Sequence, residues 1–403
     1  MSHVTETATT RKHKLRMAVI GLASVLLAAL FAPPHALALP ASHRAAMALR
    51  MGGPGTASKI AVFGTDNRSK LPRHLEALRG SIGLIYNERT RTVCSAFCVA
   101  DDMIGTASHC VYRTRGETVP PPEEFYFSRP GTRHPIARFA GATSRSAAQH
   151  ILAGTMGIST KPPIDAARDW ALIKLQGPAC RGQALGVMAI TPDEVEREAK
   201  AGRLFQTAFH RDFGRWSLAY SEPCMAGRRI DGVAGPVTER DFADPLNLVL
   251  HTCDTGGASS GSPLLIEAAG GLQVVAINVG TFVQSRVMIE QGVVVRRTPA
   301  APVANTAVST VAFAGRLEAF RAASILNSPG DLRELQRLLA ALHLFGGPFD
   351  GQFSAGTRAA IEIYEGGAGL PVTGLPTRAL LEKLQGPDAV TASPSRLRPS
   401  GSR

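Results

Sequence analysis

From Lys59 onward the chain consists of short apolar runs separated by turn-forming residues, and this pattern constrains its fold more than any other feature. The runs are IAVF, SIGLIY, WALIKL, LVLHTC, LQVVAINVG and GVVVRR, bounded by Gly, Pro, Asn and Asp. Runs this short suit strands better than helices, and their close spacing is typical of an all-β barrel or sandwich. We therefore expect a mainly β fold from residue 59.

The N-terminal 38 residues are predicted to be a signal peptide and not part of that fold. Four basic residues between Arg11 and Arg16 precede an apolar run from Met17 to Ala32, and small residues at 36–38 suit cleavage after Ala38. An uncleaved membrane anchor is the alternative, although the run is short for a spanning helix. We expect a secreted or periplasmic protein without stable membrane insertion after cleavage. Residues 39–58, rich in Ala, Gly and Ser, indicate a leader or propeptide.

The cysteine content agrees with export. The chain has six cysteines, all beyond the signal segment: Cys94, Cys98, Cys110, Cys180, Cys224 and Cys253. An even number outside the reducing cytosol suggests disulfides. No spacing repeats as the paired C-x-x-C ligands of a structural zinc site, so the sequence predicts no metal and no cofactor.

The net charge is +12 for the full chain and about +9 without the signal segment. A nucleic-acid partner is disfavoured, because the arginines are scattered and not interleaved with aromatic residues. A solvated basic surface, or attraction to an anionic cell envelope, explains the charge better.

Three segments carry residues suited to nucleophilic catalysis: TASHC at 106–110, RDWALIKL at 168–175 and GGASSGSP at 256–263. A serine hydroxyl is a poor nucleophile until a neutral imidazole accepts its proton, and a carboxylate fixes the tautomer of that imidazole. We predict Ser260 as nucleophile, His109 as general base and Asp169 as the orienting carboxylate. Asp165 competes for the last role, and the apolar WALIKL directly after Asp169 favours Asp169.

These segments resemble the chymotrypsin-like serine peptidases, within them the bacterial glutamyl-endopeptidase-like branch. TASHC is similar to that family's T-A-A-H-C box, DWALIKL to its D-I-A-L-L-K-L strand and SSGSP to its G-N-S-G-S-P loop, while GTDNR at 64–68 is similar to a G-x-D-D-R segment that often opens the bacterial enzymes. The resemblance implies two six-stranded antiparallel β-barrels in a peptidase domain at residues 59–324. It also implies peptide-bond hydrolysis through an acyl-enzyme.

The resemblance assigns further roles near Ser260. The backbone N–H groups of Ala258 and Ser260 would form the oxyanion hole, although glycine is usual at position 258 and alanine resists positive φ. The substrate pocket would include four residues: Asp254, Thr255, Asn278 and Gly280. Glu-specific relatives carry histidine where this chain has Asn278, which argues against Glu specificity. Asp254 occupies the position that gives a preference for Lys or Arg, although the C-D-T run is also ordinary in the bacterial branch.

The resemblance also implies a disulfide between Cys94 and Cys110 that pins the histidine loop. Cys224 with Cys253 is expected to link neighbouring strands before the nucleophile, which leaves Cys98 with Cys180. Spacing alone leaves the pairing of these last four residues open.

A different, helical unit follows. Leucines at 332, 335, 338, 339 and 342 have a helical period. The stretches LRELQRLLAAL, GGPFDGQFSAGTRAAI and GLPVTGLPTRALLEKL resemble a small three-helix peptidoglycan-binding domain, which we place at residues 325–387. The sequence departs from that family at Tyr364–Gly367, where two glycines are expected to shorten or break a helix. Residues 388–403 are expected to be a disordered tail.

Together these features predict an exported, monomeric serine endopeptidase that acts on proteins or peptides and is tethered to cell-wall peptidoglycan by its C-terminal domain. The alternative is a catalytically silent relative that acts only in binding, because of Ala258 and the altered helical turn.

Overall fold

The computed structural model describes residues 45–47, 61–113, 118–221, 224–228, 241–290 and 293–386. The predicted signal peptide, most of the predicted leader and the predicted disordered tail lie outside the described residues. No helix in the described ranges is long and apolar enough to cross a membrane.

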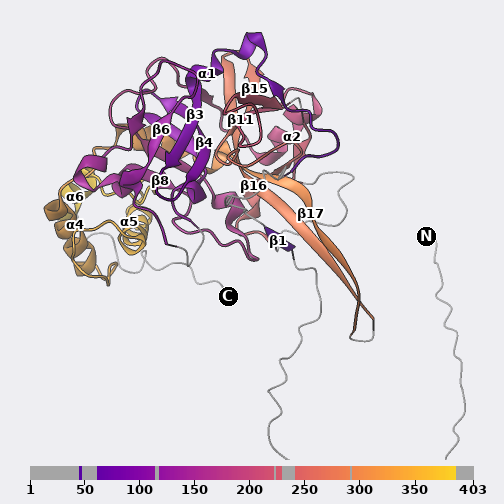
Figure 1. Ribbon diagram of the computed structural model, residues 1–403. Coiled ribbons are helices and arrows are strands. Elements are labelled where there is room, and N and C mark those ends of the chain that lie inside the picture. The colour runs from indigo at the N-terminus through magenta and orange to yellow at the C-terminus, as the bar shows by residue number, and fades with distance from the viewer. Residues whose placement is uncertain are drawn as a thin grey trace, which may run out of the picture. The chain divides into compact units, whose positions relative to one another are not determined.

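A seven-stranded antiparallel sheet forms the first half of the β fold (Figure 1). Its strand order is β7-β6-β3-β4-β5-β9-β8. The strands are β3 (Ile82–Asn87), β4 (Thr92–Ala100), β5 (Met103–Thr106), β6 (Tyr126–Ser128), β7 (Ala137–Arg138), β8 (Ile151–Ala153) and β9 (Ala171–Lys174). Most of their residues are buried, as the uninterrupted apolar runs predict.

A ten-stranded sheet forms the second half, and its neighbours are antiparallel except for β10 and β16. Its main path is β13-β14-β17-β16-β15-β11-β12-β2, with β1 and β10 on β16. The longer strands are β11 (Phe205–Phe209), β12 (Leu218–Ser221), β14 (Leu248–His251), β15 (Pro263–Ala268), β16 (Gly271–Glu290) and β17 (Val293–Ser309). The short ones are β1 (Ala45–Met47), β2 (Ser69–Lys70), β10 (Gly186–Val187) and β13 (Ala226–Gly227).

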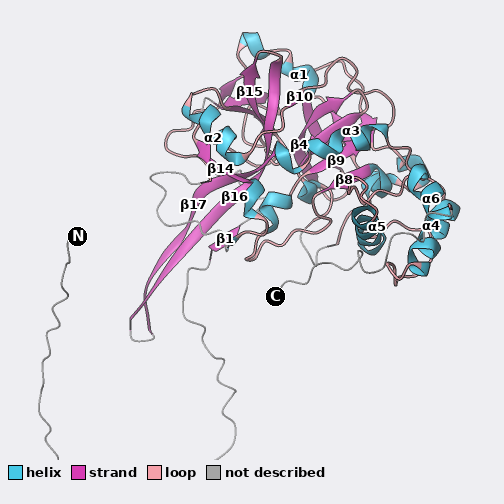
Figure 2. Ribbon diagram, turned by 180° about the vertical axis from the view of Figure 1, so that it is seen from behind, coloured by secondary structure: helices cyan, strands magenta, loops and turns pink. Residues whose placement is uncertain are grey.

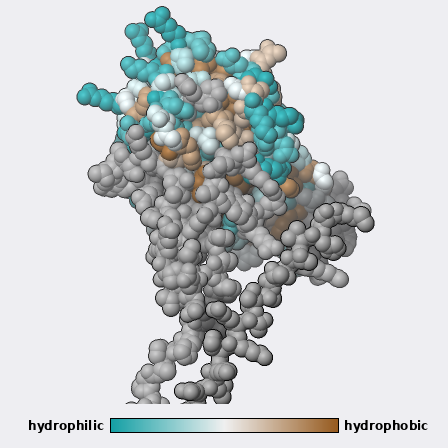
Figure 3. Space-filling model, turned by 90° about the vertical axis from the view of Figure 1, so that its right-hand side faces the viewer, coloured by the Kyte–Doolittle hydropathy of each residue, from teal (hydrophilic) through white to brown (hydrophobic). Residues whose placement is uncertain are grey.

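The predicted fold class, mainly β with two antiparallel sheets followed by helices, is confirmed. Each sheet has more than the six strands predicted, because short edge strands add to it. The ends of β16 and β17 form a two-stranded arm that extends beyond the rest of the second sheet (Figure 2). Seen from the right of Figure 1, hydrophobic residues lie in small groups between hydrophilic ones on the coloured surface (Figure 3).

Three helices accompany the β fold. α1 (Leu78–Ser81) precedes β3, α2 (Pro192–Lys200) precedes β11, and α3 (Ala314–Ala322) follows β17. α2 begins at Pro192, because the Thr191 hydroxyl accepts the N–H of Glu194 at 3.3 Å and the Glu194 carboxylate accepts the N–H of Thr191 at 2.6 Å.

The C-terminal unit contains α4 (Pro329–Ala341), α5 (Ala355–Gly367) and α6 (Arg378–Gln385) around its own apolar core. The two glycines expected to shorten or break α5 are its last two residues: the helix is not broken before them, and it ends at Gly367. The buried Glu365 explains this. Its carboxylate accepts the backbone N–H groups of Thr373 and Gly374 at 2.6 and 2.7 Å, which ties the last turn to the next segment.

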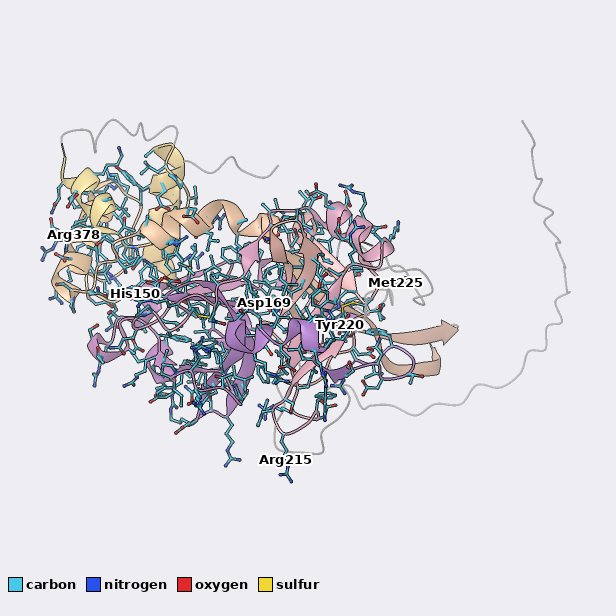
Figure 4. All side chains as sticks on the ribbon, turned by 90° about the horizontal axis from the view of Figure 1, so that it is seen from above. His150, Asp169, Arg215, Tyr220, Met225 and Arg378 are labelled. Carbon is cyan, nitrogen blue, oxygen red and sulfur yellow. A yellow bond between two sulfur atoms is a disulfide. The ribbon has the colours of Figure 1, made fainter. Side chains whose placement is uncertain are left out.

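This unit is in contact with the first sheet. The Asn327 side chain accepts a hydrogen bond from the Ser146 hydroxyl at 3.1 Å and lies 2.7 Å from His150 Nε2, and Arg358 donates to the carbonyl of Ala153 in β8. Figure 4 shows His150 on the side of the β fold nearest these helices. The predicted domain boundary at 324/325 therefore lies within a packed junction, where Ile325 also forms a β-bridge with Thr377.

Candidate active site

His109 and Asp169 come together because strands β5 and β9 are paired neighbours. Thr106, at the end of β5, is opposite Ala171, at the start of β9. His109 lies three residues after Thr106 in a short 3₁₀ turn, and Asp169 lies two residues before Ala171. The pairing of two strands far apart in the sequence thus places the imidazole beside the carboxylate.

The Asp169 carboxylate is fully buried and accepts three hydrogen bonds from the histidine turn. Its Oδ2 lies 2.6 Å from His109 Nδ1, and its Oδ1 accepts the His109 N–H and the Ser108 hydroxyl, each at 2.9 Å. Figure 4 places Asp169 in the interior, whereas Arg215 projects outward. The other candidate, Asp165, instead accepts the backbone N–H of Ser159 at 2.8 Å. The geometry therefore selects Asp169 over Asp165 as the partner of His109.

Ser260 lies in the loop between β14 and β15, and we call Gly256–Ser262 the nucleophile loop. This loop belongs to the second sheet but is fastened to the first. The N–H of Ser95 in β4 donates to the carbonyls of Ala258 and Ser260 at 2.8 and 2.9 Å. Gly261, at φ +82°, packs so closely that a Cβ there would lie 2.1 Å from Thr106 Oγ1. Only glycine fits this contact, which places Ser260 near the turn that carries His109.

The three predicted catalytic residues are thus on adjoining segments, and the His109–Asp169 pair is assembled. Among the described residues, no hydrogen bond joins Ser260 Oγ to His109. His109 Nε2 lies 3.8 Å from Cys110 Sγ, and Ser260 is half-buried. Contacts between a nucleophile and its base are often loose before substrate binds. The role of Ser260 therefore stays a prediction.

Three backbone N–H groups of the nucleophile loop have no acceptor in the described structure, those of Gly257, Ala258 and Ser260, and the last two are the ones predicted for the oxyanion hole. Within the described structure, the N–H groups of Ala258 and Ser260 have no acceptor, whereas those of Ser259, Gly261 and Ser262 donate to backbone carbonyls at 3.2, 2.7 and 3.0 Å. Ala258 adopts φ +79°, the left-handed conformation that glycine would adopt without strain. The Ala258 and Ser260 N–H groups are thus free to donate to another acceptor, and their role in an oxyanion hole stays a prediction.

We predict that Ala258→Gly leaves the reactivity of the site nearly unchanged. Glycine relieves the positive φ, worth about 1 kcal/mol, but costs about 0.5–1 kcal/mol in unfolded-state entropy, so the free energy of unfolding should change by less than about 1 kcal/mol. The rate of Ser260 labelling by a fluorophosphonate should stay within about twofold. A tenfold faster rate in the variant would show that Ala258 distorts the hole.

The predicted substrate-pocket residues divide into two groups. Thr255 directly precedes the nucleophile loop, and Gly280 lies in β16. The Thr255 hydroxyl donates to Asn305 Oδ1 at 3.1 Å. Asn278 instead supports the nucleophile loop: its Nδ2 donates to the Ser259 carbonyl at 3.0 Å, and its Oδ1 lies 3.1 Å from His251 Nε2. The sequence analysis missed Asn305, whose only signal was its position in a polar break of an apolar run.

The structure gives Asp254, also predicted for the substrate pocket, partners in a distant segment of the chain. Its buried carboxylate accepts the backbone N–H groups of Phe63 and Asn67 at 2.8 and 2.9 Å. A carboxylate that already serves two N–H donors is stabilised where it is, and its charge is directed to the N-terminal segment. Sequence alignment could not reveal this, because residues 61–68 are far from Asp254 in the chain.

The three predicted disulfides are present in the structure, joining Cys94 to Cys110, Cys98 to Cys180 and Cys224 to Cys253. The first joins β4 to the His109 turn, which holds the general base against the sheet. Two groups of Cys and His, around His109 and His251, are close enough to suggest metal sites. In both groups the sulfur atoms are in disulfides, so they cannot act as the thiolate ligands that zinc requires.

Two buried histidines make stability depend on pH. Burial lowers the pKa of His251 to about 4, and burial together with the charge of Arg68 lowers that of His210 to about 3. The unfolded chain binds these two protons below about pH 6.5 while the folded chain does not. The free energy of unfolding should therefore fall as pH falls from 6.5 to about 4, by about 1.4 kcal/mol per pH unit for each histidine.

Urea unfolding between pH 7 and 4.5 measures this slope. His251→Gln should reduce the slope by one proton. An equal slope in the wild type and the His251 variant would contradict the assignment.

Comparisons with known proteins bear on both halves of the chain. Residues 328–384, which include α4 to α6, match the family model described as "Putative peptidoglycan binding domain", as the sequence predicted. A search of curated proteins found no match. A solved structure of a Glu endopeptidase in complex with MPD is similar at 18% identity and a TM-score of 0.41, covering 65% of this chain and 100% of that chain. The chemistry of the site is therefore argued from its own geometry.

Proposed function

We propose that this protein is a serine endopeptidase that uses Ser260, His109 and Asp169. The observation that carries the proposal is the site's combined geometry: a buried His109–Asp169 pair joined at 2.6 Å, near a loop whose Ala258 and Ser260 N–H groups are unpaired. A base with a fixed tautomer and two free donors beside a serine are the parts that acyl transfer needs.

In the proposed reaction, the hydroxyl of Ser260 attacks the peptide carbonyl while His109 Nε2 takes its proton. Asp169 Oδ2 holds the proton on Nδ1, so that Nε2 is the free acceptor, and stabilises the imidazolium that forms. The N–H groups of Ala258 and Ser260 stabilise the tetrahedral oxyanion, by roughly 3–4 kcal/mol for each donor. The imidazolium then gives its proton to the leaving amine, and water hydrolyses the acyl-enzyme by the same steps.

A fluorophosphonate probe tests this proposal on the mature chain. The probe should form a covalent bond to Ser260 Oγ, and mass spectrometry of the digested protein should find the adduct on the peptide that contains residues 256–263. The catalytically silent alternative predicts no adduct. Absence of labelling in a folded protein, checked by a cooperative unfolding transition, would reject the proposed peptidase activity.

We further propose that the protein is exported and binds peptidoglycan through its C-terminal unit. The disulfides and the matched domain support both. One hollow of about 300 Å³ in this unit is a candidate contact for glycan. It is lined by Leu344, Phe345, Gly346, Gly347, Pro348, Asp350, Ser354 and Gly356. Phe349, which lies in the chain between two of these residues, is 47% exposed. Apolar faces with a few polar groups are typical of small-ligand sites.

Sedimentation with insoluble peptidoglycan tests this binding on the full mature chain. We expect co-sedimentation that soluble peptidoglycan fragments compete away, and Phe349→Ala should weaken it about tenfold or more. Leu246→Ala, at an exposed apolar residue outside the unit, is the matched control and should bind as the wild type does. No sedimentation of the wild type would reject the tethering role.

A further inference from the structure

We propose that residues 61–68 brace the nucleophile loop, and that Arg68 and Asp254 are positioning residues for the reaction at Ser260. This inference rests on the proposed function, and it adds to that function a segment that lies ahead of the first sheet. Neither residue touches the reacting atoms. Each acts by holding the backbone from which the Ala258 and Ser260 N–H groups project.

The first contact is with the chain just before the nucleophile loop. Ala61 and Thr255 exchange both of their backbone hydrogen bonds, at 3.2 and 2.9 Å. The Asp254 carboxylate accepts the N–H groups of Phe63 and Asn67. Asp254 is 1% exposed, so these hydrogen bonds form in a low-dielectric interior where a charged acceptor is strong. Residues 61–67 are thus paired along the segment that leads into the loop.

The second contact is an ion cluster against the first residue of the loop. The Arg68 side chain, 2% exposed, donates to both oxygens of Asp212 at 3.0 and 2.8 Å and to both oxygens of Asp66 at 3.0 and 2.9 Å. A Cβ at Gly256 would lie 2.4 Å from Asp212 Oδ1 and 2.7 Å from Arg68 Nη1. The cluster therefore packs directly on the backbone of the loop, and the planar guanidinium is the group whose geometry fits two carboxylates at once.

Two neighbours of the cluster hold the loop by hydrogen bonds. His210 Nδ1 accepts the N–H of Gly256 at 2.9 Å, and the N–H of Arg211 donates to the carbonyl of Gly257 at 2.7 Å. Burial and the positive charge of Arg68 lower the pKa of His210 to about 3. Nδ1 therefore stays unprotonated and remains an acceptor at neutral pH. Arg68 thus supports Gly256 by packing, while burial keeps His210 neutral.

These restraints explain how Ala258 keeps a strained conformation. A non-glycine residue at positive φ persists only where its surroundings over-determine it. Gly256 and Gly257, just before it, would otherwise give the backbone freedom to relax. Without the brace, the N–H of Ala258 would turn from the oxyanion position, and a displacement of about 1 Å can lower the rate about 10²-fold.

The test compares Arg68→Lys and Asp254→Asn with a matched control in the full mature protein. Lysine keeps the charge of Arg68 but cannot bridge two carboxylates, and asparagine keeps the shape of Asp254 but puts an amide donor or a weaker acceptor at the N–H groups. Arg129→Lys is the control, because Arg129 is also buried, at 3% exposed, but donates to the carbonyls of Gly80 and Ala179 in the other half of the fold.

Active-site titration with a fluorophosphonate counts competent sites, and steady-state hydrolysis of an ester substrate then gives kcat per titrated site. We expect kcat per site to fall about 10²-fold in both test variants with KM within about threefold, and to stay within twofold of the wild type in Arg129→Lys. Circular dichroism well below the unfolding temperature confirms that each variant is folded.

A wild-type value of kcat per site in folded Arg68→Lys or Asp254→Asn would overturn the proposed positioning role. A loss confined to the number of titratable sites would also overturn it, because a purely structural role predicts that result. Should Arg68→Lys fail to fold, the more conservative Asp254→Asn decides. An untitratable wild type would instead overturn the proposed function, so the two failures are distinguishable.

Discussion

Replacing Ser260 with alanine should lower kcat/KM of the mature protein on a peptide substrate by roughly 10⁵- to 10⁶-fold. Alanine has no hydroxyl to attack the carbonyl, so the acyl-enzyme cannot form. The unpaired N–H groups of Ala258 and of residue 260 remain in place. They should leave a residual rate about 10³-fold above the uncatalysed reaction, because they still stabilise an oxyanion formed by water attack.

Neighbouring serines provide the control for Ser260. Ser259 and Ser262 lie in the same loop. The Ser259 carbonyl accepts a hydrogen bond from the side-chain amide of Asn278, and the Ser262 hydroxyl accepts one from the side-chain amide of Gln206 at 2.8 Å. Their alanine variants should lose less than about tenfold in kcat/KM. Hydrolysis of a fluorogenic peptide and covalent labelling measure all three variants. Labelling that persists in Ser260→Ala and disappears in Ser259→Ala would move the nucleophile by one residue.

Asp169→Asn should lower kcat about 10⁴-fold while the fold is kept. In the wild type, the Asp169 carboxylate accepts a hydrogen bond from His109 Nδ1 at 2.6 Å. An asparagine amide in the same position donates to Nδ1, which shifts the proton to Nε2 and leaves no acceptor for the Ser260 proton. The loss should therefore be larger than removal of one hydrogen bond would cause.

Asp165→Asn is the matched control, because Asp165 is also buried and accepts a backbone N–H, that of Ser159. Its kcat should stay within about threefold of the wild type, whatever its effect on stability. Stopped-flow measurement of acylation at neutral pH compares both variants. Equal losses in Asp165→Asn and Asp169→Asn would indicate a general destabilisation of this turn instead of a specific role for Asp169.

Local signals in the sequence were sufficient for several features. The start of α2 has a local cause, because the two hydrogen bonds of the capping box at Thr191 form between residues three apart. The apolar runs predicted buried strands, and the leucine period predicted α4. The disulfide between Cys94 and Cys110, taken from a family resemblance, is also present. All these features depend on neighbouring residues or on a motif whose parts are contiguous.

Contacts between segments that are distant in the chain could not be predicted from the sequence. α5 runs through two glycines because Glu365 is anchored by Thr373 and Gly374, and a helix propensity scale contains no such contact. The sequence favoured Asp169 over Asp165 because the apolar WALIKL follows it, but only the pairing of β5 with β9 shows how Asp169 reaches His109. Both carboxylates had a plausible place in the sequence.

The sequence by itself determined the residue types at the site, the mainly β class and the helical C-terminal unit, because motifs and hydrophobic periods are local properties of the chain. Only the tertiary structure decided that Asp254 accepts the N–H groups of Phe63 and Asn67, and that the Ala258 and Ser260 N–H groups are left without acceptors. Hydrogen-bond partners and burial are set by which segments pack together, and residues 61–68 meet residues 254–257 only in the folded chain, because nearly two hundred residues separate them in the sequence.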